Sequence, residues 1–503
     1  MGKRVHTHGC RHQWDIVHNS GNKADDYDDN RLIADFGIKP SGQCGEHAVS
    51  GKRGHGKQDA DEKYHRRHVN TFKGFGKPEV ILLFLCLVAM QNVANQPNAG
   101  RSVDHKINNK LVNEESQMGE REFSPDEANL IASASNQFAF DLYLNLKDSE
   151  GNIFFSPFSL STAMAMTYEG AAGQTAQEIK QVFHYPDNLE VMREEFAKVI
   201  NLINKKDKKY ELHTANALWA QKGYPLLTQY VSTVEKYYGG KVTDLDFARE
   251  TENSRLIINH WVEEQTNNRI KDLIPPGVLN QLTRLVLTNA IYFKGKWEQV
   301  FPERNTEETE FKVSDGKKVK VPMMSIREKR FNYLENDELQ LVELPYAGQE
   351  ISMLVLLPKN DLTSLEPRLT ASQLNEYKKQ LRSEKIDIYL PKFKFETKYM
   401  MGGKKGILGR MGMPIAFSPT EADFSGINGR RDFYLSEVVH QAFVEVNEEG
   451  TEAAAATGLV VGVTMVVKKL VFRADHPFIF IIQDRATGNI LFMGRVVDPS
   501  ASK

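Results

Sequence analysis

The sequence predicts an α+β fold in one large domain, from Ser124 to Ser500. Helix-like and strand-like apolar patterns occur in both halves of this region. No linker, internal repeat or change in composition divides it. Hydrophobic residues make up 41% of the 503-residue chain, which is enough apolar side chain to bury a large core.

Composition and charge exclude several classes of function. The net charge is -2, from 64 Lys plus Arg against 66 Asp plus Glu, which argues against a protein that coats nucleic acid with basic charge. The longest apolar run is about eleven residues, and a membrane-spanning helix needs about 20. The three cysteines, Cys10, Cys44 and Cys86, all precede the domain, which excludes a disulfide framework or a cysteine-based metal site there. We therefore expect no nucleic-acid or membrane partner, no metal and no cofactor.

Residues 1–77 are rich in His, Gly, Asp and Lys and have no apolar periodicity. His8, Cys10 and His12 have a spacing that would suit Zn or Cu, but nothing nearby predicts a fold to hold the ligands. The alternative is a low-complexity extension that is disordered or absent from the mature protein.

Residues 78–94 are similar to a secretory signal peptide. The basic flank Lys73–Lys77 precedes the apolar run Val80–Met90, and small and polar residues follow to Ala94. Such signals normally stand at the extreme N-terminus, so a buried strand in a cytosolic extension is the alternative. We expect a secreted, extracellular protein whose residues 95–123 form a flexible leader.

The first half of the domain predicts helices and one strand. Ser124–Glu127 is a capping box with Pro in the first helical position, and apolar residues then recur every four positions to Leu146. A second helix is predicted over Ser159–Tyr168 and a strand over Thr214–Ala220. A third helix is predicted over Ile257–Ile274, because Pro275-Pro276-Gly277 ends it.

The second half predicts mainly strands. Leu285–Phe293 is too continuously apolar to be half exposed, which indicates a buried strand. Gln340–Tyr346 and Ile351–Leu357 predict a hairpin. Ile386–Leu390 alternates apolar with polar residues, and Val438–Val446 forms a long apolar strand.

Motifs of enzymes are missing from the chain. It has no G-x-S-x-G, H-E-x-x-H or P-loop, and the glycines and lysines of Gly402–Gly406 lack the ending of a phosphate-binding loop. We therefore predict no catalytic residue. The clusters Lys205–Lys209 and Lys317–Lys320 have two interpretations, as solvated loops or as a site for a sulfated polysaccharide.

The segment after Val446 has the composition of a strand that can enter a sheet. Gly450 gives backbone freedom where a loop must bend. Period-two alternation then places Thr451, Ala453, Ala455 and Thr457 on one small, uncharged face. An alanine run also suits a helix, but the Gly and Thr residues on both sides favour the sheet. We call this segment the hinge, and it comprises Gly450, Thr451, Glu452, Ala453, Ala454, Ala455 and Ala456.

This region resembles the serpin family. The hinge motif EEGTEAAAAT precedes the signature FRADHPFIF at Phe472–Phe480 and LFMGRV ending at Val496. Further matches are Asn152–Pro157, Thr288–Trp297 and Ala422–Ile427. The resemblance, over Ser124–Pro499, implies three β-sheets, eight or nine helices and an exposed reactive-centre loop. One departure is a group of four glycines at 402, 403, 406 and 409, which puts a local helix in doubt.

The resemblance implies inhibition of serine proteases by a monomer. The protease attacks the loop, forms an acyl-enzyme and is trapped when the cleaved loop enters the central sheet. Family spacing from Gly450 places the reactive bond between Thr464 and Met465, within one or two residues, which suits an elastase-like or chymotrypsin-like protease. The alternatives are a carrier or chaperone serpin that is merely cleaved, and a true hydrolase.

The resemblance also carries over residues of the sheet that opens. Ser156, Ser159, Asn289 and His440 match the polar cluster under this sheet, and Trp297 matches an aromatic residue at its top. Ordinary core positions are the alternative for each. At the root of the loop, the side chain of Thr451 is expected to reach water.

Overall fold

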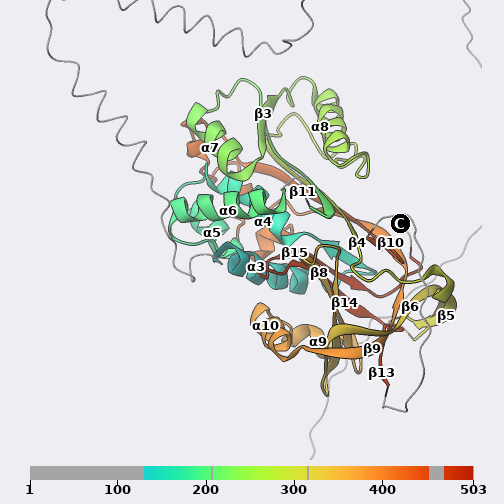
Figure 1. The fold of residues 1–503 in the computed structure, drawn as a ribbon. Helices are drawn as coiled ribbons and strands as arrows, with labels where there is room; N and C mark the ends of the chain where they lie inside the picture. Colours follow the sequence, from blue (N-terminus) through green and yellow to red (C-terminus); the bar gives the residue numbers. More distant parts are fainter. Residues whose placement is uncertain (1–129, 205–207, 314–315, 452–468, 502–503) are drawn as a thin grey trace, which may run out of the picture. The chain divides into compact units, whose positions relative to one another are not determined.

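A computed structural model describes residues 130–204, 208–313, 316–451 and 469–501. The predictions for the first 123 residues and for the capping box lie outside these described residues. The described part is built from helices and two β-sheets, which confirms the α+β class (Figure 1). None of its helices is long and apolar enough to cross a membrane.

The larger sheet has nine strands and is held together by the long strand β6. β6 pairs with β5 in its N-terminal third, with β9 from Met323 to Tyr333 and with β7 at its C-terminal end. A bulge between Ile326 and Lys329, where Glu328 has φ 57°, bends the strand. Two sheet regions are thereby continuous, so the described residues form two sheets instead of the expected three. The strands are β1 (Ile153–Phe155), β5 (Glu307–Lys312), β6 (Lys318–Glu335), β7 (Leu339–Pro345), β8 (Ile351–Pro358), β9 (Arg382–Pro391), β13 (Leu470–Arg473), β14 (Phe478–Asp484) and β15 (Ile490–Val496).

The second sheet has six strands in the order β10-β11-β12-β4-β2-β3. β4 and β11 run parallel and pair directly from Leu285 against Leu435 to Tyr292 against Phe443. We call this direct pairing the seam, and the C-terminal ends of both strands the hinge end. The strands are β2 (Tyr210–Gln221), β3 (Lys241–Leu245), β4 (Leu285–Lys296), β10 (Phe393–Met400), β11 (Leu435–Asn447) and β12 (Gly450–Thr451).

The described residues contain ten α-helices, against the eight or nine expected. Three of them, α9, α11 and α12, are single turns of four or five residues, so the number depends on whether such short turns are counted as helices. Short 3-10 turns lie at Glu303–Asn305, Glu366–Arg368 and Ile415–Phe417. The helices are α3 (Leu130–Leu146), α4 (Pro157–Tyr168), α5 (Gly173–Phe183), α6 (Leu189–Ile203), α7 (Thr228–Tyr238), α8 (Thr251–Gln265), α9 (Leu362–Leu365), α10 (Ala371–Gln380), α11 (Ile407–Met411) and α12 (Ser425–Asn428).

The predicted strands are confirmed as β2, β4, β7, β8, β9 and β11. The helix predicted over Ile257–Ile274 begins and ends too late, because α8 begins at Thr251. α8 ends at Gln265. The next residues include Asn267 and Asn268, which have φ values of 51° and 58°. Asparagine tolerates this left-handed conformation, which cannot continue a right-handed helix. The two prolines therefore lie well beyond the true end of the helix.

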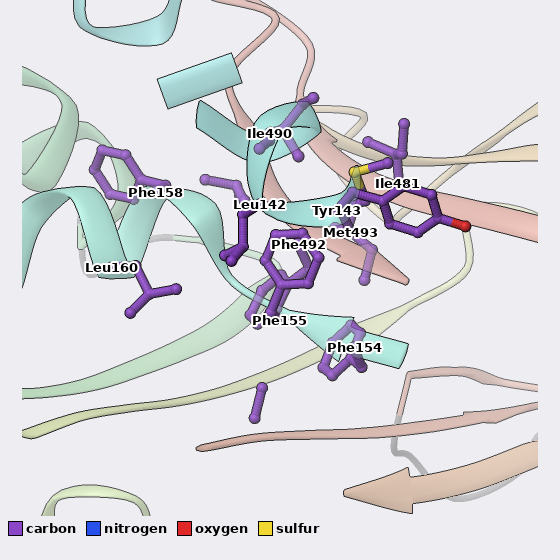
Figure 2. Close-up of a cluster of buried hydrophobic side chains, with 14 of the residues drawn as sticks. Leu142, Tyr143, Phe154, Phe155, Phe158, Leu160, Ile481, Ile490, Phe492 and Met493 are labelled. Atoms are coloured by element: carbon purple, nitrogen blue, oxygen red, sulfur yellow. The ribbon is translucent and has the colours of Figure 1, made fainter. Parts of the chain in front are cut away.

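The two faces of the six-stranded sheet pack against different cores. Figure 2 shows part of the larger core, including Phe154 of β1 and Phe492 of β15. The ring of Phe154 stacks on those of Phe480 and Phe492, with centroids 5.6 Å and 5.2 Å apart. A smaller core lies under α8. Odd-numbered residues of β2 such as Trp219 enter the smaller core and even-numbered ones such as Leu218 enter the larger, as strand alternation requires.

The glycines at 402–409 allow the backbone to fold back on itself. A Cβ at Gly406 would lie 1.8 Å from the carbonyl oxygen of Gly402, and a Cβ at Gly409 would lie 2.4 Å from that of Lys404. The helix that the glycines put in doubt survives only as the five-residue α11.

Candidate functional site

The hinge begins inside the six-stranded sheet. Its first two residues form β12, which pairs antiparallel with both β11 and β4 at the hinge end. Gly450 faces Asn447 and Lys296, and Thr451 faces Val446 and Gly295. β12 therefore lies between β4 and β11 directly beyond the seam.

Gly450 is required at this position for two reasons. Its φ of 153° lies in the region that L side chains rarely adopt. A Cβ would also lie 2.0 Å from the carbonyl oxygen of Gly295 on β4. The sequence predicted a glycine that lets the loop bend, and the close approach of the two backbones adds a steric reason.

The expectation that Thr451 reaches water is wrong. The residue is only 1% exposed, and its Oγ1 lies 2.8 Å from the hydroxyl of Tyr346 in a hydrogen bond. Burial raises the pKa of Tyr346, and the hydrogen bond with Thr451 opposes this effect only in part. The tyrosine is therefore a neutral partner, and Thr451 already points into the interior.

Trp297 lies at the hinge end, beside Tyr346, the residue that shares a hydrogen bond with Thr451. Its ring stacks on Tyr346 at a centroid distance of 4.5 Å. Its Nε1–H donates to the carbonyl oxygen of Asn447 at 3.0 Å, and its backbone N–H donates to that of Glu449 at 2.7 Å. The indole thus holds the turn between β11 and β12.

The structure brings Ser156, Ser159, Asn289 and His440 together in the middle of the seam. His440 of β11 and Asn289 of β4 are paired in register, and Nδ1–H of His440 donates to Oδ1 of Asn289 at 2.5 Å. The backbone N–H of Ser156 donates to Nε2 of His440 at 3.1 Å, and Nδ2 of Asn289 donates to Oγ of Ser159 at 2.5 Å. The network joins both strands of the seam to the start of α4.

Sequence analysis missed one member of this network. Asn216 of β2 accepts hydrogen bonds at Oδ1 from Asn289, at 2.5 Å, and from Ser159, at 3.3 Å. The available sign was a single amide inside the otherwise apolar strand Thr214–Ala220, a position where a buried polar group needs partners.

His440 is held in its neutral form. Burial lowers its pKa from 6.5 to about 3, although its hydrogen bond with Asn289 acts in the opposite direction. Nε2 accepts a hydrogen bond from the backbone N–H of Ser156, so a proton on Nε2 would place two N–H donors opposite each other. The seam is therefore closed by neutral hydrogen bonds.

Two acidic residues precede the hinge. The carboxylate of Glu448 binds Lys392 and the hydroxyl of Thr306, each at 2.8 Å. Burial raises the pKa of Glu448, but these two partners outweigh it and the net shift is downward. Oε2 of the adjacent Glu449 is buried and has no hydrogen-bond partner among the described residues. Both residues begin the hinge motif EEGTEAAAAT, but the motif predicted no separate role for either of them.

Other expected site residues fall outside this arrangement. Glu452–Ala456 and the bond between Thr464 and Met465 lie outside the described residues. In the two lysine clusters, Lys208 pairs with Glu350 and Lys318 with Glu310. Part of the positive charge expected to face a polysaccharide is therefore neutralised. Within the described ranges, no three His, Cys, Asp or Glu side chains are grouped so that they could hold a metal ion.

Comparison with known proteins decides the family. Residues 133–499 match the family model "Serpin (serine protease inhibitor)". The chain belongs to the serpin family.

Relatives of this serpin occur in distant organisms. An uncharacterized serpin-like protein of Methanosarcina acetivorans is 44% identical over 375 residues, covering 74% of this chain and 87% of the relative. Leukocyte elastase inhibitor A of Mus musculus is 40% identical over 380 residues, covering 73% and 99%.

Solved serpin structures show the same fold. Serpin48 of the insect Tenebrio molitor has a TM-score of 0.66 at 35% identity, covering 73% of this chain and 98% of its own. Human thyroxine-binding globulin, solved with its ligand, has a TM-score of 0.67 at 29% identity, covering 75% and 100%.

The burial of His440 predicts a stability that falls in acid. In the unfolded chain the imidazole takes up a proton near pH 6.5, whereas in the folded serpin it does so near pH 3. Its contribution to folding is therefore complete above pH 6.5. It declines by up to about 1.4 kcal/mol per pH unit between pH 6.5 and 3. Urea unfolding of the wild type and of His440→Gln, which does not titrate, measures this term. Parallel pH profiles for the two proteins would contradict it.

The burial of Thr451 predicts that Thr451→Arg destabilises the native serpin. The substitution removes the hydrogen bond to Tyr346 and places an unpaired guanidinium in a site that excludes water. We expect a loss of about 3 kcal/mol in the free energy of unfolding, measured by denaturant. Thr451→Ser keeps the hydroxyl and should lose less than about 1 kcal/mol. Equal stability of the arginine variant and the wild type would show that the position reaches water after all.

Proposed function

We propose that this serpin inhibits serine endopeptidases by a suicide-substrate mechanism. The protease cleaves the loop beyond β12 and is held as an acyl-enzyme, while the cleaved loop enters the sheet between β4 and β11. The carrying observation is β12 itself, which is already paired with both strands at the hinge end. Insertion would then extend this short strand along the seam.

The register of β12 supports a specific inserted position for each loop residue. Each residue after Thr451 would face one position earlier on β4 and on β11, because β12 is antiparallel to both. Six positions on, Thr457 would face Asn289 and His440, which are partners across the seam. The Thr457 hydroxyl would offer these two residues a hydrogen bond in place of the one they lose.

The exchange of hydrogen bonds favours insertion. One parallel ladder between β4 and β11 is replaced by two antiparallel ladders, each hydrogen bond contributing about 1 kcal/mol. Fifteen residues from Gly450 to Thr464 extend about 50 Å at about 3.3 Å each. The attached protease would be carried along the sheet over that distance. The serpin supplies no catalytic group, because the protease's own nucleophile performs the cleavage.

We assign the reactive bond to Thr464–Met465 from family spacing, within one or two residues. Residues of this size and polarity suit the specificity pocket of an elastase-like or chymotrypsin-like protease, and neither is the Arg or Lys that a trypsin-like enzyme requires. The 40% identity with a leukocyte elastase inhibitor supports the same class of target.

Incubation with pancreatic elastase and with chymotrypsin tests the proposal. We expect an adduct with one of them that survives SDS, and a released C-terminal peptide that begins within two residues of Met465. Cleavage without an adduct would indicate a carrier or chaperone serpin, and repeated turnover of a substrate by the serpin alone would indicate a hydrolase. Trapping that follows cleavage at Lys468 or Lys469 would overturn the assigned bond.

The register also predicts opposite effects at neighbouring loop positions. Ala455 would face inward, on the same side as Thr451, whereas Ala454 would face outward. Ala455→Arg should slow insertion at least tenfold, so that the variant is cleaved at the same bond but releases active protease. Ala454→Arg, the matched control, should still trap protease with an unchanged stoichiometry. Equal trapping by both variants would refute the proposed register.

A further inference from the structure

The segment that follows α8 folds back beneath the helix and forms one unit with it. Both backbone groups of Ile274 bond to the side-chain amide of Asn259, at 2.8 Å and 3.0 Å, and Arg255 donates to the same carbonyl oxygen at 2.9 Å. Ile270, Leu273 and Ile274 are fully buried in the smaller core with the inner face of α8. We call α8 together with residues 266–274 the cover.

The cover lies across the seam. The smaller core joins it to Val286 and Ala290 of β4 and also to Val439 of β11. Neighbouring strands are about 4.8 Å apart, so a strand that enters between β4 and β11 moves one half of the sheet away by that distance. The cover cannot keep its contacts with both halves.

Several contacts fasten the cover to the half that contains β3, β2 and β4. Lys241 of β3 contacts the rings of both Trp219 on β2 and Trp261 on α8, with Nζ 5.1 Å and 5.2 Å from their centroids. The two indoles meet edge to face at 5.4 Å. Asn267 of the cover also bonds to His213 of β2 at 3.1 Å.

On the other half, a lysine of β10 holds the cover. Nζ of Lys398 donates to the backbone carbonyl oxygen of Asp272 at 2.6 Å. Asp272 has a φ of 47°, a conformation that a residue other than glycine adopts at a cost. This contact therefore joins β10 to a strained point of the cover, on the side of the seam opposite to Lys241.

We propose that the contact between Lys398 and Asp272 is a latch that must break before the loop can insert, so that Lys398 acts as a positioning residue for the inhibitory reaction. This inference rests on the proposed function. The cover stays with β3, β2 and β4 through the Lys241 contacts, and it parts from β10 when the seam opens. The latch slows insertion and keeps the seam closed until a protease has cleaved the loop.

Lys398→Met tests the latch, since methionine keeps most of the side chain's length and removes the donor. A synthetic peptide with the sequence of residues 451–464 serves as the inserting strand, and its uptake is followed by native gel shift and by the rise in thermal midpoint. We expect uptake to be about fivefold faster in the variant than in the wild type. With chymotrypsin or elastase, the variant should also consume fewer inhibitor molecules for each protease trapped.

Lys394→Met is the matched control. Lys394 lies on the same strand four residues earlier, and it pairs at 2.9 Å with Glu445 of β11, which belongs to the same half of the sheet. Its removal breaks no contact across the seam and should leave the uptake rate unchanged. Equal rates in the wild type and Lys398→Met, or an equal acceleration by Lys394→Met, would overturn the latch while the proposed function stands. A wild type that neither takes up the peptide nor forms an adduct would overturn both.

Discussion

The direct pairing of β4 with β11 is the interaction on which the rest of the structure depends. The two strands are parallel neighbours along the seam, and β12 enters between them at the hinge end. The pairing of β4 with β11 can be replaced, because an antiparallel strand between the two would make more hydrogen bonds than they make with each other. The native sheet is therefore less strongly hydrogen-bonded than a sheet with an additional strand between β4 and β11 would be.

Polar residues buried at the seam fit this arrangement. An apolar seam would be simpler to pack, yet His440 and Asn289 lie in it. They are satisfied by hydrogen bonds to each other and to Asn216 of the neighbouring strand β2. Such groups stabilise the closed seam only while every partner is present. Under the proposed mechanism, His440 and Asn289 would meet the hydroxyl of Thr457 after insertion, so they would have a partner in both the closed and the opened sheet. At the hinge end, Tyr346 bonds to Thr451 of β12, and Trp297 bonds to the turn before it.

The sequence was most informative where local pattern decides structure. Strand periodicity located β4 and β11, and the small residues after Gly450 indicated a segment able to enter a sheet. It failed where distant residues decide. Thr451 is buried because Tyr346, 105 positions earlier in the chain, meets its hydroxyl. No local pattern contains that information.

Two other differences have local causes that periodicity does not capture. α8 ends early because Asn267 and Asn268 adopt left-handed backbone conformations, although the apolar spacing continues to Ile274. The described residues form two sheets because the bulged strand β6 belongs to two sheet regions and joins them into one. The polar cluster at the seam was predicted from the family resemblance. Asn216 was not predicted, because its place in the cluster depends on the register of β2 against β4.

A crystal structure of the serpin cleaved in its loop by a protease that it does not trap tests the account most directly. We expect β4 and β11 to be separated by a new strand that continues β12, with residue 457 between Asn289 and His440. A cleaved molecule in which His440 still bonds to Asn289 across an intact seam would contradict the account.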